Sequence, residues 1–149
     1  MWTAEAVLAC ALTLLGRSVS SFPPIEFVTT VPADASPQAE AYVRVNDKRI
    51  FLVTTSHHFQ VLQRARDKCG DLTSARKLAS ILIHEETHLR QGTDEATAYT
   101  AQLTTLMALG AGIGSPPYTE VVRAMRQALA KPKRKPERIV VLSGTDPPN

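Results

Sequence analysis

The stretch from His84 to Glu95, His-Glu-Glu-Thr-His-Leu-Arg-Gln-Gly-Thr-Asp-Glu, lies in the most strongly helical part of the chain. Asp71 or Thr73 can cap the start of this helix, and Gly92 suits its end. Apolar residues recur between these points with the spacing of one buried helix face. They are Leu78, Ile81, Leu82 and Leu89. The pattern predicts one amphipathic helix that carries both histidines.

The two histidines of this helix are one turn apart. At about 100° per residue, His84 and His88 lie roughly 40° apart on the helix surface, so both imidazoles can bind one metal ion. Glu85 lies roughly 60° beyond His88, where it can reach a water molecule without being a ligand. Two imidazoles and a carboxylate suit zinc, which lowers the pKa of a bound water towards about 7. The spacing therefore predicts a zinc (Zn2+) site with Glu85 as general base.

A third protein ligand is expected close by in the sequence. Glu95 follows the glycine turn and lies in the first turn of the next predicted helix, from which its carboxylate can fold back over the histidines. Asp94 is the nearest alternative, although it resembles a helix cap. Glu120, on the opening turn of the last predicted helix, is a more distant alternative. We predict Glu95 as the third ligand and keep Asp94 and Glu120 as alternatives.

Three other side chains are candidates for roles near the metal. Tyr99 lies one turn beyond Glu95 on the same helix face, where its hydroxyl could stabilise an oxyanion or orient a ligand. His57 and His58 follow a predicted strand and could approach the same cleft. Residues at such a junction are more often polar residues of a helix start, so only Tyr99 enters the predicted catalytic set with Glu85.

The segment resembles the zincin superfamily of metallopeptidases in His84, Glu85 and His88. A glutamate third ligand at Glu95 is similar to the gluzincin branch, and Asp-Glu-Ala-Thr-Ala-Tyr from residue 94 is similar to small predicted bacterial metallopeptidases. The resemblance implies hydrolysis of peptide bonds in a peptide or protein substrate. It also implies a small sheet, an active-site helix and a second helix that brings the glutamate.

Zincins usually lay their substrate along an edge strand above the active-site helix. The segment Arg49 to Thr54 immediately precedes the helical half of the chain and is the predicted edge. Residues 41–45 and 49–54 alternate in polarity around a turn at 46–48, which is typical of a hairpin. We therefore expect an α+β fold, mostly helical and zincin-like, with a small antiparallel sheet or hairpin packed on the helix of the histidines.

The chain is divided by composition into a domain at residues 1–130 and a basic, proline-rich tail at 131–149. The formal net charge of +3 arises mainly in that tail. Its basic residues are Lys131, Lys133, Arg134, Lys135 and Arg138. Because the remainder is close to neutral, we expect no nucleic-acid partner. A non-catalytic zinc-binding interaction module is the first alternative to an enzyme, and a basic nucleic-acid-associated protein with a structural metal is the second.

The N-terminal apolar run, residues 6–15, has the length of a signal-peptide core but no Lys or Arg before it. It is too short to span a bilayer. Its large residues recur at helical spacing, which favours a core helix over residues 3–19 and a cytoplasmic location, with a signal peptide as the alternative. Cys10 and Cys69 are far apart and form no C-x-x-C pair, so Cys10 is interpreted as a small core residue and no disulfide framework is expected.

Overall fold

The computed structural model describes residues 1–44, 46–130 and 140–144. Within these residues the chain forms five α-helices, one short 3-10 helix and four strands. The fold is α+β and mostly helical, as predicted. In chain order the elements are α1 (Ala4–Leu14), η1 (Val19–Ser21), β1 (Ile25–Val28), β2 (Ala39–Arg44), β3 (Ile50–Val53), α2 (His57–Arg64), α3 (Leu72–Gln91), α4 (Glu95–Ala108), α5 (Pro116–Ala130) and β4 (Val140–Gly144).

The strands form one mixed sheet in the order β1-β3-β2-β4. Antiparallel pairing of β2 with β3 confirms the predicted hairpin, with Tyr42 opposite Phe51. However, β1 pairs with β3 in parallel, so the sheet is not purely antiparallel. The prediction that Arg49 to Thr54 forms an edge strand is wrong, because β3 lies between β1 and β2. All four residues of β3 are buried, as expected for a strand covered on both faces.

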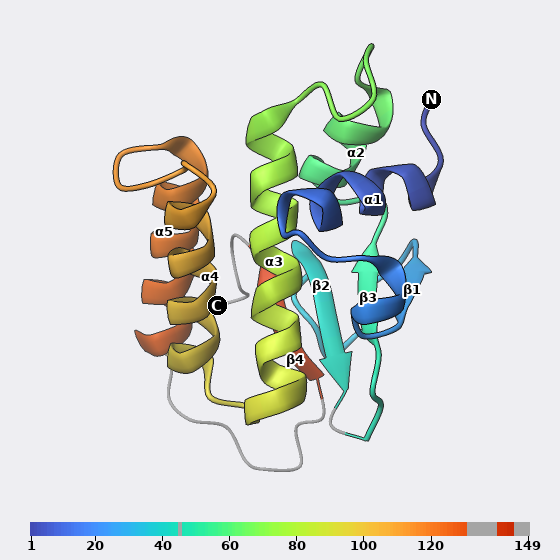
Figure 1. Cartoon of the computed structure of the whole chain (residues 1–149). Helices are drawn as coiled ribbons and strands as arrows, with labels where there is room; N and C mark the ends of the chain where they lie inside the picture. Colours follow the sequence, from blue (N-terminus) through green and yellow to red (C-terminus); the bar gives the residue numbers. More distant parts are fainter. Residues whose placement is uncertain (45, 131–139, 145–149) are drawn as a thin grey trace.

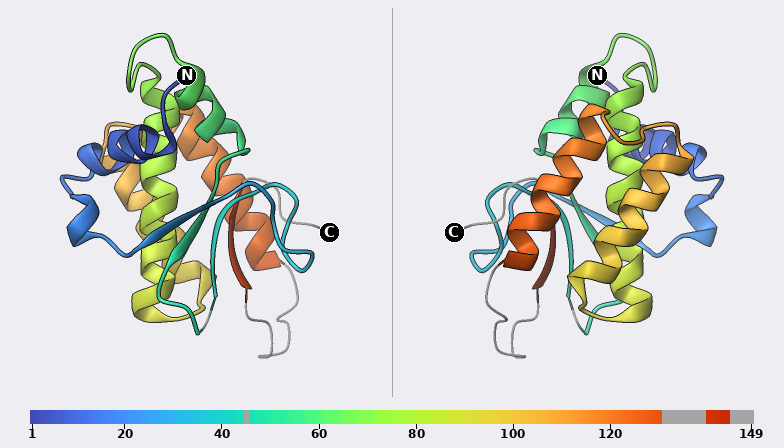
Figure 2. Two further views of the ribbon diagram at one scale, coloured as in Figure 1. Left: turned by 90° about the vertical axis from the view of Figure 1, so that its right-hand side faces the viewer. Right: turned by 90° about the vertical axis from the view of Figure 1, so that its left-hand side faces the viewer.

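Helix α3 runs through the middle of the molecule (Figure 1). In the view of Figure 1, the sheet, α1 and α2 lie to the right of α3, and α4 and α5 lie to its left. The views turned by 90° show that α1 and most of the sheet lie on different sides of α3 (Figure 2). The main core fills the space between α1, α2, α3 and the sheet, and its largest fully buried members include Leu12, Ile50, Leu52, Phe59, Leu78 and Ile81. This burial holds α3 in place and leaves the face with the histidines turned towards α4.

The N-terminal segment folds as a shorter helix than predicted. Helix α1 ends at Leu14, because Gly16 adopts a φ of +65° that turns the chain away before residue 19. Val7, Leu8 and Leu12 are buried in the main core, in agreement with a core helix. Among the described residues, no helix has the length and apolar character needed to cross a bilayer.

The two cysteines form a disulfide, contrary to the interpretation of Cys10 as an unpaired core residue. Cys10 on α1 pairs with Cys69, with 5.5 Å between their Cα atoms. Helix α2 ends at Arg64, and the loop that follows brings Cys69 back to α1. A separation of 59 residues leaves no local pattern that could have indicated this pairing.

The predicted C-terminal tail is only partly described. Residues 140–144 form β4, which pairs antiparallel with β2, with Tyr42 opposite Leu142. This segment therefore belongs to the sheet rather than to a separate tail. The basic residues at 131–138 lie outside the described part of the chain, so the predicted tail remains a prediction there.

Candidate metal centre

Helices α3 and α4 are joined by a tight turn that returns the chain towards the histidines. Asp71 caps α3 by accepting a hydrogen bond from the backbone N–H of Ser74. Gly92 ends α3 with a φ of +95°, a conformation that favours glycine. Asp94 caps α4 by accepting from the N–H and the hydroxyl of Thr97. These three local signals place Glu95 at the first position of α4.

The turn brings together the three residues predicted as metal ligands. Oε1 of Glu95 lies 3.1 Å from Nε2 of His84 and 2.7 Å from Nε2 of His88. The two Nε2 atoms are 3.2 Å apart. Ligand atoms about 2 Å from a tetrahedral zinc ion lie roughly 3.3 Å from one another, so the spacing is close to that of an ion's ligands. The donor set of two imidazoles and one carboxylate also suits zinc.

The ring of His88 is held in one orientation by the end of its own helix. Its Nδ1 lies 2.9 Å from the carbonyl oxygen of Gly92. Because a carbonyl oxygen only accepts, Nδ1 carries the hydrogen, and the lone pair of Nε2 faces the centre. The Nδ1 of His84 lies 2.9 Å from Oε1 of Gln102 on α4. Both histidines thus have an outer partner of the kind that orients metal ligands.

The electrostatics of this group favour a bound cation. Burial lowers the pKa of His84, although the neighbouring Glu95 partly opposes this. Burial alone would raise the pKa of Glu95, but its close contacts with His84 and His88 outweigh burial and lower that pKa to about 2. At neutral pH the centre therefore combines an ionised carboxylate with imidazole nitrogens at contact distance, an arrangement that a cation stabilises.

Of the two residues predicted to act on the substrate, Tyr99 contacts this centre, and Glu85 follows His84 directly on α3. Glu85 is fully buried. Tyr99 packs its ring edge against the ring of His84, with 4.5 Å between the centroids. Burial raises the pKa of the Tyr99 hydroxyl, and the charges of Glu95 and Glu85 raise it further. The hydroxyl is therefore protonated at neutral pH and can donate a hydrogen bond.

Glu86, next to Glu85 in the sequence, has a different environment. Its carboxylate accepts from Arg17 at 2.8 Å and from Arg90 at 3.0 Å. The side chain is buried, but it ties α3 to the segment after α1 rather than facing the histidines. Glu86 is thus a structural residue and a useful control for Glu85.

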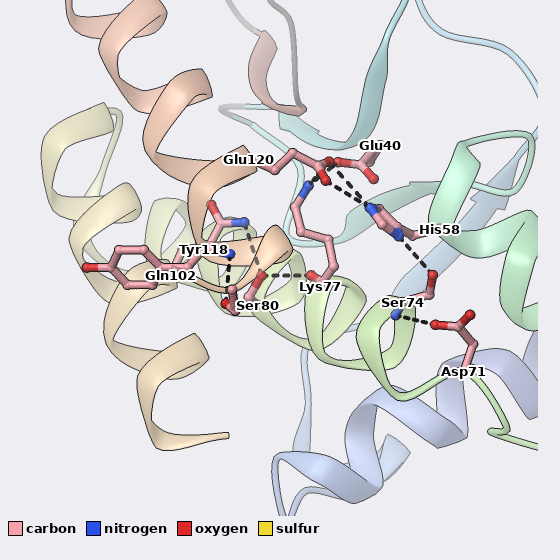
Figure 3. Close-up of polar contacts among 10 residues, drawn as sticks. Glu40, His58, Asp71, Ser74, Lys77, Ser80, Gln102, Tyr118 and Glu120 are labelled. Atoms are coloured by element: carbon pink, nitrogen blue, oxygen red, sulfur yellow. Dashed lines mark hydrogen bonds and ion pairs between the residues drawn. The ribbon is translucent and has the colours of Figure 1, made fainter. Parts of the chain in front are cut away.

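The alternative ligand Glu120 belongs to a second cluster of charged side chains (Figure 3). Glu40, His58 and Glu120 come together there, but the ammonium of Lys77 lies between the two carboxylates and bonds to both. Lys77 is only 2% exposed. Its charge therefore takes the place that a metal ion would need, and we assign no metal to this cluster.

A cavity of about 660 Å³ opens beside the second cluster. Residues that line it include Glu40, Val53, His57, Thr119, Glu120 and Arg123. The structure thus places His57 at this cavity and His58 in the second cluster, and neither belongs to the group of His84, His88 and Glu95. Asp94, the other alternative ligand, is the cap of α4.

Gln102 lies beside the candidate metal centre and was not predicted from the sequence. It lies seven residues after Glu95, about two helical turns, and therefore on the same face of α4. That spacing was a usable signal for a partner of the histidines. The sequence holds no comparable signal for the contact between Lys77 and Glu40, because Lys77 lies on α3 and Glu40 on β2.

No protein-family model matches this sequence, and no curated protein and no solved structure shows significant similarity to it. The resemblance to zincins therefore depends on the motif residues and their spacing. The geometry of the three donors is independent of that resemblance, because it comes from the fold of this chain.

Proposed function

We propose that this protein is a zinc-dependent metallopeptidase. The observation that supports the proposal best is the convergence of His84, His88 and Glu95 to within 4.8 Å of one another. Two of these donors come from α3 and the third from α4, so the group is held by two packed helices. An acidic residue, Glu85, adjoins the first histidine in the position expected of a general base.

Each residue has a defined part in the proposed reaction. A zinc ion held by His84, His88 and Glu95 would supply Lewis acidity to a water molecule and to a substrate carbonyl. Glu85 accepts a proton from the attacking water and delivers it to the nitrogen of the leaving amine. Tyr99 donates a hydrogen bond to the oxygen that becomes negative when the carbonyl is attacked.

The proposed substrate is an extended segment of a peptide or protein. Within the described residues, β4 is the strand at the edge of the sheet next to β2, and it packs against α3. An extended peptide can add to such an edge through backbone hydrogen bonds, which give affinity with little side-chain selectivity. The proposed substrate path therefore follows β4 rather than β3.

Exchange of Glu85 tests the enzymatic part of the proposal. Glu85→Gln keeps the size of the side chain but removes the base, so turnover of a fluorogenic peptide library should fall by about 100-fold or more. Zinc content should stay that of the wild-type protein. Glu86→Gln is the matched control and should retain both activity and zinc. Unchanged turnover in Glu85→Gln would refute the proposed mechanism.

A zinc-binding module without catalysis is the second candidate. The burial of the centre favours it, since His84 and Glu85 are fully buried and His88 is 5% exposed. Glu95 is the most open member, with 27% of its side chain exposed. A wild-type protein that binds zinc and cleaves no member of the library would select this candidate.

A further inference from the structure

A chain of hydrogen bonds runs from the backbone of α3 to the inner histidine. The Ser80 hydroxyl donates to the carbonyl oxygen of Lys77 at 2.7 Å. Nε2 of Gln102 donates to Oγ of Ser80 at 3.2 Å, and Oε1 of Gln102 lies 2.9 Å from Nδ1 of His84. Ser80 and His84 are fully buried and Gln102 is 2% exposed. Figure 3 shows the part of this chain from Gln102 to Lys77.

The backbone carbonyl of Lys77 determines which group donates and which accepts at each step of this hydrogen-bond chain. A carbonyl oxygen only accepts, so Ser80 uses its single hydrogen on Lys77. Ser80 can then only accept from Gln102, which turns the amide NH2 of Gln102 towards Ser80 and its oxygen towards His84. That oxygen only accepts, and the hydrogen between the two side chains therefore belongs to Nδ1 of His84.

The opposite orientation of the Gln102 amide would prevent His84 from binding a metal ion through Nε2. Its NH2 group would donate to Nδ1 of His84, so the hydrogen of a neutral ring would lie on Nε2. Nε2 is the atom that faces Glu95 and His88, and a protonated nitrogen has no lone pair for a metal. In this orientation the oxygen of Gln102 would face Ser80, so the Ser80 hydroxyl would have to donate to Gln102. Ser80 would then lose its hydrogen bond to the carbonyl oxygen of Lys77.

We propose that Gln102 and Ser80 are positioning residues of the metal centre, which hold His84 in the tautomer that directs the lone pair of Nε2 at the metal. This inference rests on the proposed zinc site. Gln102 acts directly on His84, and Ser80 acts by orienting Gln102. The network thus extends the function of α4 beyond the supply of Glu95.

Zinc affinity, measured by competition with a chromophoric chelator, tests the inference on the full chain. Gln102→Met keeps the shape of the side chain but removes the acceptor, and zinc affinity should fall by about 10- to 100-fold. Gln102→Glu restores an acceptor for His84 and should rescue most of the loss. Ser80→Ala should give a smaller fall. Ser74→Ala removes a buried serine of α3 that contacts His58 instead, and it should leave affinity unchanged.

Nitrogen NMR of the imidazole rings in the metal-free protein is a second test, because it shows which ring nitrogen of His84 carries the hydrogen. His84 should carry a hydrogen on Nδ1 in the wild-type protein and lose it in Gln102→Met. Wild-type affinity in a folded Gln102→Met variant, or a wild-type His84 without the Nδ1 hydrogen, would overturn this inference and leave the zinc site intact. A wild-type protein that binds no zinc would overturn the proposed function as well.

Discussion

The carboxylate of Glu95 lies 2.7 Å from Nε2 of His88, although α3 ends between these two residues. Gly92 allows the chain to reverse, and Asp94 then starts α4 by capping it. The short connection gives the third donor little freedom to move away from the histidines. Asp94 and Glu95 are adjacent in the sequence, but Asp94 caps α4 whereas Glu95 is a candidate metal ligand.

Exchanges at these two acidic positions should have opposite consequences. We expect Glu95→Gln to weaken zinc binding by at least about 100-fold, more than the loss of an outer partner would. Asp94→Ala should retain zinc and lower the free energy of unfolding by about 1 kcal/mol, because it removes the cap of α4. Chelator competition and urea denaturation measure the two effects. Loss of zinc from Asp94→Ala with zinc retained in Glu95→Gln would reverse the assignment.

The Tyr99→Phe variant should distinguish the packing of the Tyr99 ring from the catalytic role of its hydroxyl. The phenylalanine ring can keep the edge contact with His84, so zinc affinity should remain within a factor of about two. Turnover should fall by about 100-fold, since the donor to the developing oxyanion is lost. Tyr118→Phe on α5 is the control and should leave kcat unchanged. Equal kcat for Tyr99→Phe and the wild-type protein would remove Tyr99 from the mechanism.

The link between Cys10 and Cys69 should contribute measurably to stability. It closes a loop of 59 residues, for which loop-closure entropy gives about 4 kcal/mol. Urea denaturation should show a loss of that order when reductant is added. Cys69→Ala should show the same loss without reductant and no further loss with it. Two free thiols in the purified wild-type protein under non-reducing conditions would contradict the pairing.

Glu120 should make stability depend on acidity below neutral pH. Burial alone would raise its pKa, but contacts with His58 and Lys77 lower it from 4.5 to about 2. A lowered carboxyl pKa stabilises the fold above pH 4.5, and this contribution is lost as the pH falls to about 2. Its upper limit is roughly 3 kcal/mol.

Denaturation at several pH values tests this dependence. The free energy of unfolding should decline less steeply between pH 4.5 and 2 for Glu120→Gln than for the wild-type protein. Glu5→Gln, on the exposed side of α1, should follow the wild-type curve. Parallel curves for Glu120→Gln and the wild-type protein would show that the second cluster does not depend on this charge.

Local patterns predicted α3, its caps and the position of Glu95. Asp71, Gly92 and Asp94 act on residues within four positions of themselves, so the sequence reveals their effect directly. The hairpin of β2 and β3 was predictable for the same reason. The two histidines and Glu95 could therefore be placed together before the fold was known.

Contacts between distant segments were not predictable in this way. Lys77 meets Glu40 across 37 positions and Glu120 across 43, and such spacings carry no periodic signal. The parallel pairing of β1 with β3 likewise depends on how the whole sheet assembles.

The cytoplasmic location also remains a prediction, and the disulfide argues against it because such bonds are typical of oxidising compartments.

The zinc content of the purified protein tests the central claim most directly. Elemental analysis should find about one zinc ion per wild-type chain and almost none in the folded His88→Ala variant, since the remaining two donors cannot hold the ion alone. A folded wild-type protein without zinc after exposure to the metal, or a His88→Ala variant with the wild-type content, would contradict the account.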